Sequence, residues 1–418
     1  MFFPQSVKDF FSLFFSNIFQ KVLGLVRELV IAFFLGSSIL YANFLLLRVV
    51  ADFFSQITAG NALKANLLPK FTKLYNKFDQ ISLVQVSNFS VRASYFLFFI
   101  SQIIQTAVIF YLDLQSNYLF FLASFILSFC ICFNFINTIF LTVLQARGFF
   151  LKYSYASVTN SLVFTIIIYP LVSLFSFIGL AISRLIGIVS MSILFVSPMR
   201  REKRGKEIFL DPTDFNFPTL ILGNFANIII ISSRFVSGSD GSNSITFFMY
   251  AIVILNALLT SVITNVSTIL LRKISIAKNK KWMIYSLLIS IFLGGVMVVF
   301  LYFFSYDITK FMYFRGVFTI SDVEQTSIYL YQLSYSFLLL FVATILFQPF
   351  LSLSIIQTKN LRFVLSTVFL ITLIVSCTFA ISSDYLVKQK TLFVMYTSSF
   401  SAVILAIFSY RNYLSYEK

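Results

Sequence analysis

Histidine is absent from the 418 residues, charged residues make up only 11% of them, and cysteine occurs three times. Without histidine, the chain has no side chain of the type that most often relays protons near neutral pH or binds metals. Soluble domains are about 25% charged and about 45–50% apolar, whereas this chain is 59% hydrophobic. No single globular core could bury that much apolar surface, so a soluble protein is excluded.

The cysteines Cys130, Cys132 and Cys377 all fall inside apolar runs. Two residues apart on a helix, Cys130 and Cys132 point to nearly opposite faces. We interpret all three as packing residues rather than as a disulfide or a metal site. We therefore expect neither a metal nor a cofactor.

Two sequence signals are also missing. The phosphate-binding pattern Gly-x4-Gly-Lys-Ser/Thr does not occur, and no soluble segment is large enough for a nucleotidase, which excludes ATP hydrolysis in this chain. A cleavable signal peptide is not expected either, because Met1–Leu35 runs on as a hydrophobic span that contains charges. The first helix should therefore be retained and act as its own insertion signal.

Apolar runs recur along the whole chain at lengths near the roughly 20 residues that cross about 30 Å of hydrocarbon. They predict an all-α polytopic membrane protein of about twelve transmembrane helices in two six-helix lobes. The fifth and sixth helices are separated by almost nothing, at Phe175 to Ile178. The predicted spans are 10–35, 40–59, 87–112, 118–144, 153–175, 177–198, 215–236, 244–270, 282–304, 329–356, 362–382 and 391–409.

The net charge of +16 comes from short loops between these spans rather than from a basic groove lined with aromatics, so nucleic acid is not expected as a partner. Cytoplasmic loops are enriched in Lys and Arg. If the N-terminus is inside, the only Lys and Arg residues in the loops on the opposite side are Lys310, Arg315, Lys388 and Lys390. We therefore predict a multi-pass protein of the bacterial inner membrane with both termini cytoplasmic.

The most polar stretch, 199–211, follows the sixth helix. It predicts an N-terminal lobe at 1–200, a basic cytoplasmic linker at 201–214 and a C-terminal lobe at 215–418. Weak internal similarity supports two related halves, since Leu-Leu-Pro-Lys at 67–70 corresponds to Leu-Leu-Arg-Lys at 270–273. Two such halves, with the substrate held between them near the midplane, are typical of transporters.

Seven ionisable residues nevertheless lie within or at the ends of spans. A charge at the membrane centre costs about 2.5–3.5 kcal/mol on the insertion scale, so each should face protein or a watery cavity. Five of the seven are cations, which favours an anionic substrate such as a lipid-linked diphosphate. The seven are Lys21, Arg27, Glu28, Arg48, Asp52, Arg184 and Arg234.

Each of these charges has a structural alternative. Lys21 and Glu28 share one face of the first helix, with Gly24 between them. In the functional interpretation, Lys21 and Arg27 contact phosphate and Glu28 orients them. In the structural one, the three charges form an ion network that stabilises the bundle.

Arg48 and Asp52 have the i,i+4 spacing of a pair on one helix face, which is structural or part of the site. Arg184 and Arg234 have no acid in their own helices and need a partner from elsewhere or an anionic ligand. Arg234, close to Ser237, could instead extend to the outer membrane surface.

Four stretches resemble the MurJ/MviN family of lipid II flippases, which belongs to the superfamily that includes MATE exporters and Wzx flippases. From Gln20 the sequence reads QKVLGLVRELVIAFFLG, followed from Ala42 by ANFLLLRVVADFFSQITAGNALKANLLPKFTKL. Residues 232–251 read SSRFVSGSDGSNSITFFMYA, and YFRGVFTISD starts at Tyr313. Together these stretches sample both halves in the family's order.

The resemblance implies that Gly24, Arg27 and Glu28 occupy the family's Gly and Arg-Asp positions and that Lys21 occupies a basic one, all lining a central cavity. Two features depart from the family pattern. The family's Tyr-Ala-Asp-Arg is Tyr250-Ala251-Ile252-Val253 here, and the family commonly has fourteen helices. Both lipid II and another undecaprenyl-linked oligosaccharide therefore stay open as cargo.

We predict a flippase that acts by alternating access on an undecaprenyl-diphosphate-linked sugar, with the lipid bilayer as its surroundings, no catalytic residues and a monomeric state. A Wzx-type repeat-unit flippase is the first alternative. A membrane glycosyltransferase or ligase would need a sizeable outer loop with paired acids, and the longest outer loop predicted here, at 305–328, is short. A MATE-like drug exporter would need an acid-lined cavity rather than a cationic one.

Overall fold

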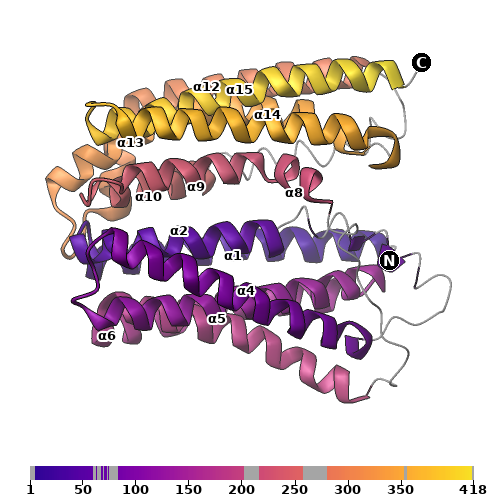
Figure 1. Cartoon of the computed structure of the whole chain (residues 1–418), viewed down its shortest axis with the longest axis horizontal. Coiled ribbons are helices and arrows are strands. Elements are labelled where there is room, and N and C mark those ends of the chain that lie inside the picture. The colour runs from indigo at the N-terminus through magenta and orange to yellow at the C-terminus, as the bar shows by residue number, and fades with distance from the viewer. Residues whose placement is uncertain are drawn as a thin grey trace. The chain divides into compact units, whose positions relative to one another are not determined.

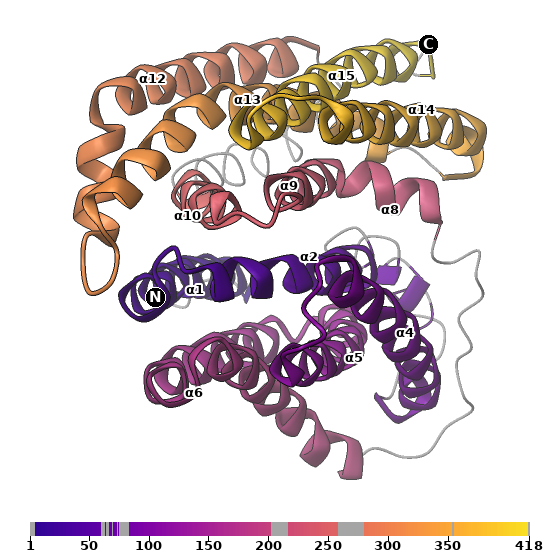
Figure 2. The same ribbon diagram turned by 60° about the vertical axis from the view of Figure 1, so that its left-hand side comes forward.

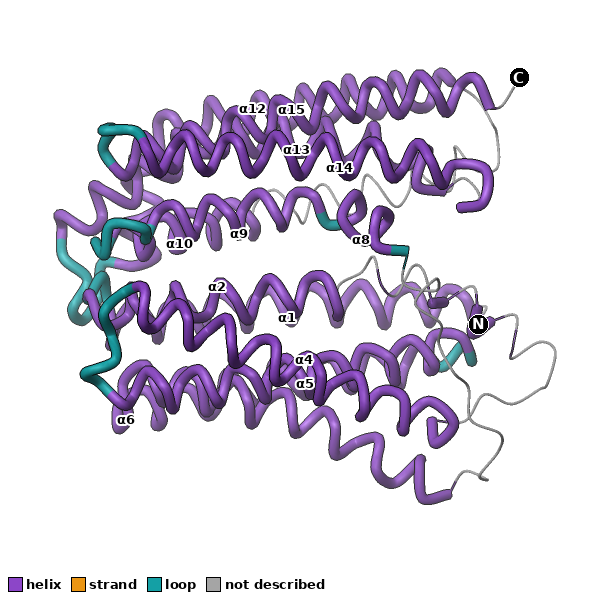
Figure 3. Tube along the Cα trace, in the orientation of Figure 1, coloured by secondary structure: helices purple, strands orange, loops and turns teal. Residues whose placement is uncertain are grey.

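The structure, a computed structural model, describes residues 5–59, 83–201, 216–257, 280–352 and 355–416, with a few further positions between 63 and 74. Within these ranges the chain consists of helices joined by short turns and has no strand (Figure 3). All twelve predicted spans overlap described helices, the eighth only in its first part. The predicted fold class is confirmed. The predicted linker, apart from Arg201, and the second copy of the internal repeat at 270–273 lie outside the described residues.

The chain divides into two compact units, one of Met1–Leu35 with Asn43–Asn216 and one of Gly36–Ala42 with Phe217–Lys418. In the first unit α1 packs against α6, and α5 packs against both α4 and α6; Figures 1 and 2 both show α4 beside α5. The helices of this unit are α1 (Gln5–Leu35), α2 (Ile39–Ala59), α4 (Leu83–Tyr111), α5 (Tyr118–Ala146) and α6 (Phe150–Arg201).

Helix α6 contains the fifth and sixth predicted spans, joined at a single non-helical residue. Ser176 has φ 53° and ψ −134°, inside the predicted boundary between Phe175 and Ile178. A Cβ at Gly179 would collide with the carbonyl oxygen of Leu171. Glycine is therefore required where the two halves of α6 meet.

Buried hydroxyl and amide groups connect α4 to α5 in the first unit. Gln105 donates a 3.0 Å hydrogen bond to Ser128, and Gln102 donates one of 3.1 Å to Ser124. Such bonds are effective in an apolar interior because the alternative is an unsatisfied polar group. The cysteines are free, and Cys132 donates from Sγ to the Ser94 carbonyl at 3.0 Å.

The second unit is built around α13, which packs extensively against α12 and α15. Its first span is broken, because α8 and α9 meet at an angle of 75° around Asn224. The helices of this unit are α8 (Phe217–Gly223), α9 (Phe225–Ser237), α10 (Ser244–Leu255), α12 (Lys280–Tyr313), α13 (Ile320–Ser352), α14 (Ile355–Ser382) and α15 (Val387–Tyr416).

One sequence prediction needs correction in this unit. Most of the predicted outer loop at 305–328 is helical, because α12 continues to Tyr313 and α13 begins at Ile320. Thr319 explains that early start, since Asp322 accepts hydrogen bonds from its backbone nitrogen and its hydroxyl at 2.7 and 2.8 Å. This arrangement satisfies donors at the beginning of a helix.

Arg362, the first residue of the predicted span 362–382, lies inside α14 and is 1% exposed. Its Nη1 donates to Thr219 of α8 at 2.9 Å, and its Nε donates to Thr358 at 2.8 Å. The guanidinium also lies over the ring of Phe350, 5.5 Å from the centroid. This side chain connects α14 to the short helix α8.

The turn Gly36–Ala42, which joins α1 to α2, belongs to the second unit by its contacts. Tyr250 donates a 2.8 Å hydrogen bond to the carbonyl of Gly36, and Ser37 donates one of 2.6 Å to Asp322. Gly36 has φ +52°, and a side chain there would meet Val317 at 2.9 Å. Glycine therefore fits where a larger residue would be strained.

Candidate functional site

Arg27 is the central cation on α1, and its guanidinium lies over an aromatic ring of α6. Its Cζ is 4.5 Å from the centroid of the Phe164 ring, a distance at which the ring attracts a cation. A Cβ at Gly24 would lie 3.4 Å from Arg27 Nη2. The guanidinium therefore lies back along its own helix, within van der Waals range of the Cβ position of Gly24.

Asp52 is shared by two arginines from different helices. Arg48 Nε lies 3.3 Å from Asp52 Oδ2, which confirms that the i,i+4 spacing places them together, and Arg184 Nη2 lies 2.8 Å from Asp52 Oδ1. The partner that Arg184 needed from elsewhere is thus an acid of α2. The three side chains are 14–20% exposed, so this ion cluster is only partly covered.

Arg48, Arg184 and Glu28 lie close enough to Arg27 for their charges to act on its guanidinium. Three guanidinium groups and two carboxylates leave a net positive charge in this part of the first unit. We call these five residues, Arg27, Glu28, Arg48, Asp52 and Arg184, the arginine cluster. Lys21 lies on the same helix, about 9 Å before Arg27 along the axis at 1.5 Å per residue, and is half-buried.

Arg184 retains one free donor in the cluster. Its Nη2 is bound to Asp52, but its Nη1 is buried and has no hydrogen-bond partner among the residues that the structure describes. A buried donor left unsatisfied costs free energy, and a guanidinium offers two parallel donors that match phosphate oxygens. The cluster is therefore suited to accept an anionic oxygen.

Three residues of α6 that the sequence interpretation did not single out shape this site. A Cβ at Gly187 would lie 2.8 Å from Phe164 Cβ and 2.9 Å from Asn160 Oδ1. The absence of a side chain at Gly187 lets the two halves of α6 approach, three residues from Arg184. A glycine inside an apolar helix indicates close packing, so Gly187 could have been found from the sequence, whereas Phe164 and Asn160 could not.

Arg234 belongs to the second unit, apart from the seven other predicted site residues, which are all in the first. It lies in the last turn of α9 and is 7% exposed. Because Arg234 is buried, an interaction within the protein is favoured over extension of the side chain to the outer membrane surface.

In the ranges that the structure covers, no group of three or more His, Cys, Asp or Glu side chains could hold a metal ion. The described helices include eight that are long and apolar enough to cross a membrane, or nine if α8 and α9 form one broken span. Helix α6 counts once here although it contains two predicted spans. The chain is a multi-pass membrane protein.

No protein-family model and no curated protein matches the sequence. Among solved structures, the fold is similar to the lipid II flippase MurJ in an inward closed conformation, with a TM-score of 0.75 and 20% identity over 97% of this chain and 87% of that one. It is also similar to an inward-facing multidrug resistance MATE family transporter of the MOP superfamily, with a TM-score of 0.67 and 12% identity over 95% of each chain.

A third similar structure is a MOP superfamily transporter from Pyrococcus furiosus, for which a binding pocket of reversed polarity suggests a different function. Its TM-score is 0.64, at 12% identity over 98% of this chain and 95% of that one. At these identities the likeness establishes the fold. The chain has the fold shared by MurJ and MATE transporters.

Proposed function

We propose that the chain is a flippase that carries an undecaprenyl-diphosphate-linked sugar from the inner to the outer leaflet of the bacterial inner membrane by alternating access. In this proposal both termini are cytoplasmic, the head group binds at the arginine cluster, and the lipid chain stays in the bilayer. The fold of known transporters supports the transport part of the proposal. The cargo is argued from the site.

The observation that carries the cargo assignment is the buried, unsatisfied Nη1 of Arg184. Asp52 fixes the guanidinium through Nη2, so little conformational freedom is lost when a ligand binds. A diphosphate supplies acceptor oxygens and the negative charge that the cluster lacks. Arg27, held over Phe164, provides a second guanidinium within electrostatic range.

The charge of the cluster also separates the candidate functions. A MATE-like exporter of cationic drugs would need an excess of acids, whereas three arginines here face two acids. An enzyme acting on the same lipid would need a catalytic loop outside the membrane, but only 314–319 separate α12 from α13. Lipid II and another undecaprenyl-linked oligosaccharide, as carried by Wzx-type flippases, fit the same head-group chemistry.

The test is binding and translocation of a lipid-linked diphosphate by purified protein in vesicles. Arg27→Ala should abolish translocation while expression and thermal stability stay near those of the parent protein. Arg411→Ala is the matched control, since Arg411 is an exposed arginine of α15. If Arg27→Ala binds and moves the lipid as the parent does, the site assignment is wrong.

A further inference from the structure

Helix α1 and the first half of α6 run side by side in the same direction. Ser157 Oγ lies 3.5 Å from Gln20 Oε1, and seven residues later on each helix the Arg27 guanidinium lies over the Phe164 ring. The two helices therefore keep the same register over about two turns. The residues of α6 that precede Phe164 by one turn can thus be placed relative to Arg27.

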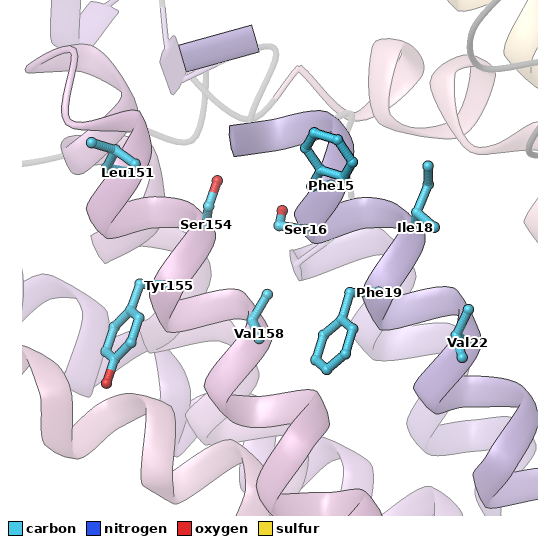
Figure 4. Close-up of a pocket in the computed structure, with 9 residues that line it drawn as sticks. All are labelled: Phe15, Ser16, Ile18, Phe19, Val22, Leu151, Ser154, Tyr155 and Val158. Carbon is cyan, nitrogen blue, oxygen red and sulfur yellow. The ribbon is translucent and has the colours of Figure 1, made fainter. Parts of the chain in front are cut away.

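The two sides of this helix pair differ in polarity. On one side is a groove of about 550 Å³, lined mostly by apolar side chains that include Val22 and Val158 (Figure 4). At 3.6 residues per turn, Arg27 lies on nearly the opposite face of α1 from Val22. Asn160 likewise lies on nearly the opposite face of α6 from Val158. Arg27 and Asn160 are therefore both on the other side of the pair from the groove.

Helix α2 and the second half of α6 also run in the same direction. The ring centroids of Phe44 and Phe177 are 5.8 Å apart, and seven or eight residues later Asp52 accepts the hydrogen bond from Arg184. This pair of helices runs opposite to the first pair, because α6 reverses direction at Ser176. A residue that follows Asp52 or Arg184 is therefore displaced toward the same end of the unit as a residue that precedes Arg27 on α1.

Three uncharged residues lie one helical turn from the arginine cluster, all toward that end of the unit. One comes four residues before Phe164, and the others come three residues after Asp52 and Arg184. We call these three residues the neutral layer: Asn160, Ser55 and Gly187. A Cβ at Gly187 would lie 2.9 Å from Asn160 Oδ1, so the layer is continuous across the two halves of α6.

The neutral layer presents hydrogen-bonding groups without charge. The Ser55 hydroxyl oxygen is buried and has no hydrogen-bond partner among the residues that the structure describes. Ser55 is seven residues after Arg48 and three after Asp52, so it shares their face of α2. The Asn160 amide can both donate and accept hydrogen bonds. An uncharged ligand rich in hydroxyl groups fits this layer, whereas a further phosphate would need cations.

We propose that the neutral layer binds the first sugar of the cargo, the one bonded to the diphosphate, through hydrogen bonds between its hydroxyl groups and Ser55 and Asn160. The inference rests on the proposed function and adds the part of the site that recognises the sugar. With the diphosphate at the arginine cluster, a sugar bonded directly to it reaches the level one helical turn away, about 5.4 Å. The cargo is therefore held by charge at one level and by neutral hydrogen bonds at the next.

Binding to the purified full-length chain in detergent tests this inference. The probes are undecaprenyl diphosphate and the same lipid carrying one glucose, galactose or N-acetylglucosamine. The parent protein should bind at least one of the three glycosylated lipids about tenfold more tightly than the bare diphosphate, because the sugar adds hydrogen bonds. We call this ratio of affinities the sugar preference.

Substitutions in the neutral layer should lower the sugar preference. Ser55→Ala should lower it about fivefold, because one hydroxyl group is lost. Asn160→Leu should also lower it about fivefold, since leucine has a similar branched shape but no hydrogen-bonding group. Arg27→Ala should instead weaken binding of all four lipids and keep the preference, because it acts on the diphosphate. Ser173→Ala is the matched control, an exposed serine close to the reversal of α6.

The outcomes separate this inference from the proposed function. If the parent protein binds none of the four lipids, the proposed function fails. If it binds the bare and the glycosylated lipids equally, the inference is overturned and the proposed function stands. If Ser55→Ala and Asn160→Leu both bind with the sugar preference of Ser173→Ala, the sugar is recognised elsewhere, which also overturns the inference. Binding of the bare diphosphate and thermal unfolding show that each variant is folded.

Discussion

Arg184 donates a 2.8 Å hydrogen bond to Asp52, although 132 residues separate them in the sequence. This bond joins α6 to α2 and fixes the guanidinium whose second nitrogen lacks a partner among the described residues. Stability and the proposed ligand binding would therefore depend on the same arginine.

Replacing Asp52 by asparagine should affect these two properties in opposite directions. Asp52→Asn removes the carboxylate charge beside two partly buried guanidinium groups. We expect the free energy of unfolding to fall by about 2–3 kcal/mol, somewhat less than for a fully buried pair. Diphosphate binding should become tighter, because the cluster gains one net positive charge. Thermal unfolding and a binding isotherm check this, and an unchanged unfolding temperature would contradict it.

Gly24→Ala should stabilise α1 and leave diphosphate binding unchanged. The new methyl group would lie 3.4 Å from Arg27 Nη2, an ordinary van der Waals contact that lets the guanidinium stay over Phe164, and alanine favours the helix by about 1 kcal/mol over glycine. Gly295→Ala on α12 is the matched control, since nothing lies within 4 Å of its Cβ position. A lower lipid affinity of Gly24→Ala than of Gly295→Ala would show that Arg27 cannot keep its position beside a methyl group.

Gly187→Ala should be destabilising. Its Cβ would lie 2.8 Å from Phe164 Cβ and 3.0 Å from the Asn160 carbonyl oxygen, and a backbone atom cannot move aside as a side-chain end can. We expect a loss of about 1–3 kcal/mol from overpacking, measured by thermal unfolding. If Gly187→Ala is as stable as Gly295→Ala, the two halves of α6 can move apart without loss of stability and the prediction is wrong.

Arg362→Met should loosen α8. The substitution removes the donors to Thr219 and Thr358 and leaves their hydroxyl groups buried. Replacing a buried ionic group by an apolar one can be nearly neutral for global stability, so the sharper readout is local. We expect faster amide hydrogen exchange in Phe217–Gly223, with exchange in α15 unchanged. If amide exchange in α8 is as slow as in the parent protein, contacts other than those of Arg362 hold this helix in place.

The helices could be predicted from the sequence because apolar runs of membrane length are a strong signal. The Arg48–Asp52 pair was predictable too, since i,i+4 spacing is a local property. The Asp52–Arg184 bond was not, because a sequence does not say which faces of distant helices meet. The contact between Phe164 and Arg27 could not be predicted for the same reason.

The charges of Asp307, Lys310 and Asp322 predict a loop where the structure has the end of α12 and the start of α13. Charge excludes a residue from the hydrocarbon, but it does not end a helix that continues into water. The spacing of Thr319 and Asp322 carries a helix-start signal that would have corrected this. The burial of Arg362 could not be predicted, since a cation near a helix end is buried only where groups such as the hydroxyls of Thr219 and Thr358 accept its hydrogen bonds.

The reversal at Ser176 has a mechanical consequence. A connection of one residue has no slack, so the first half of α6, with Phe164, is tied closely to the second half, with Gly187 and Arg184. A movement of Phe164, over whose ring the Arg27 guanidinium lies, would therefore be transmitted to the half of α6 that carries Arg184.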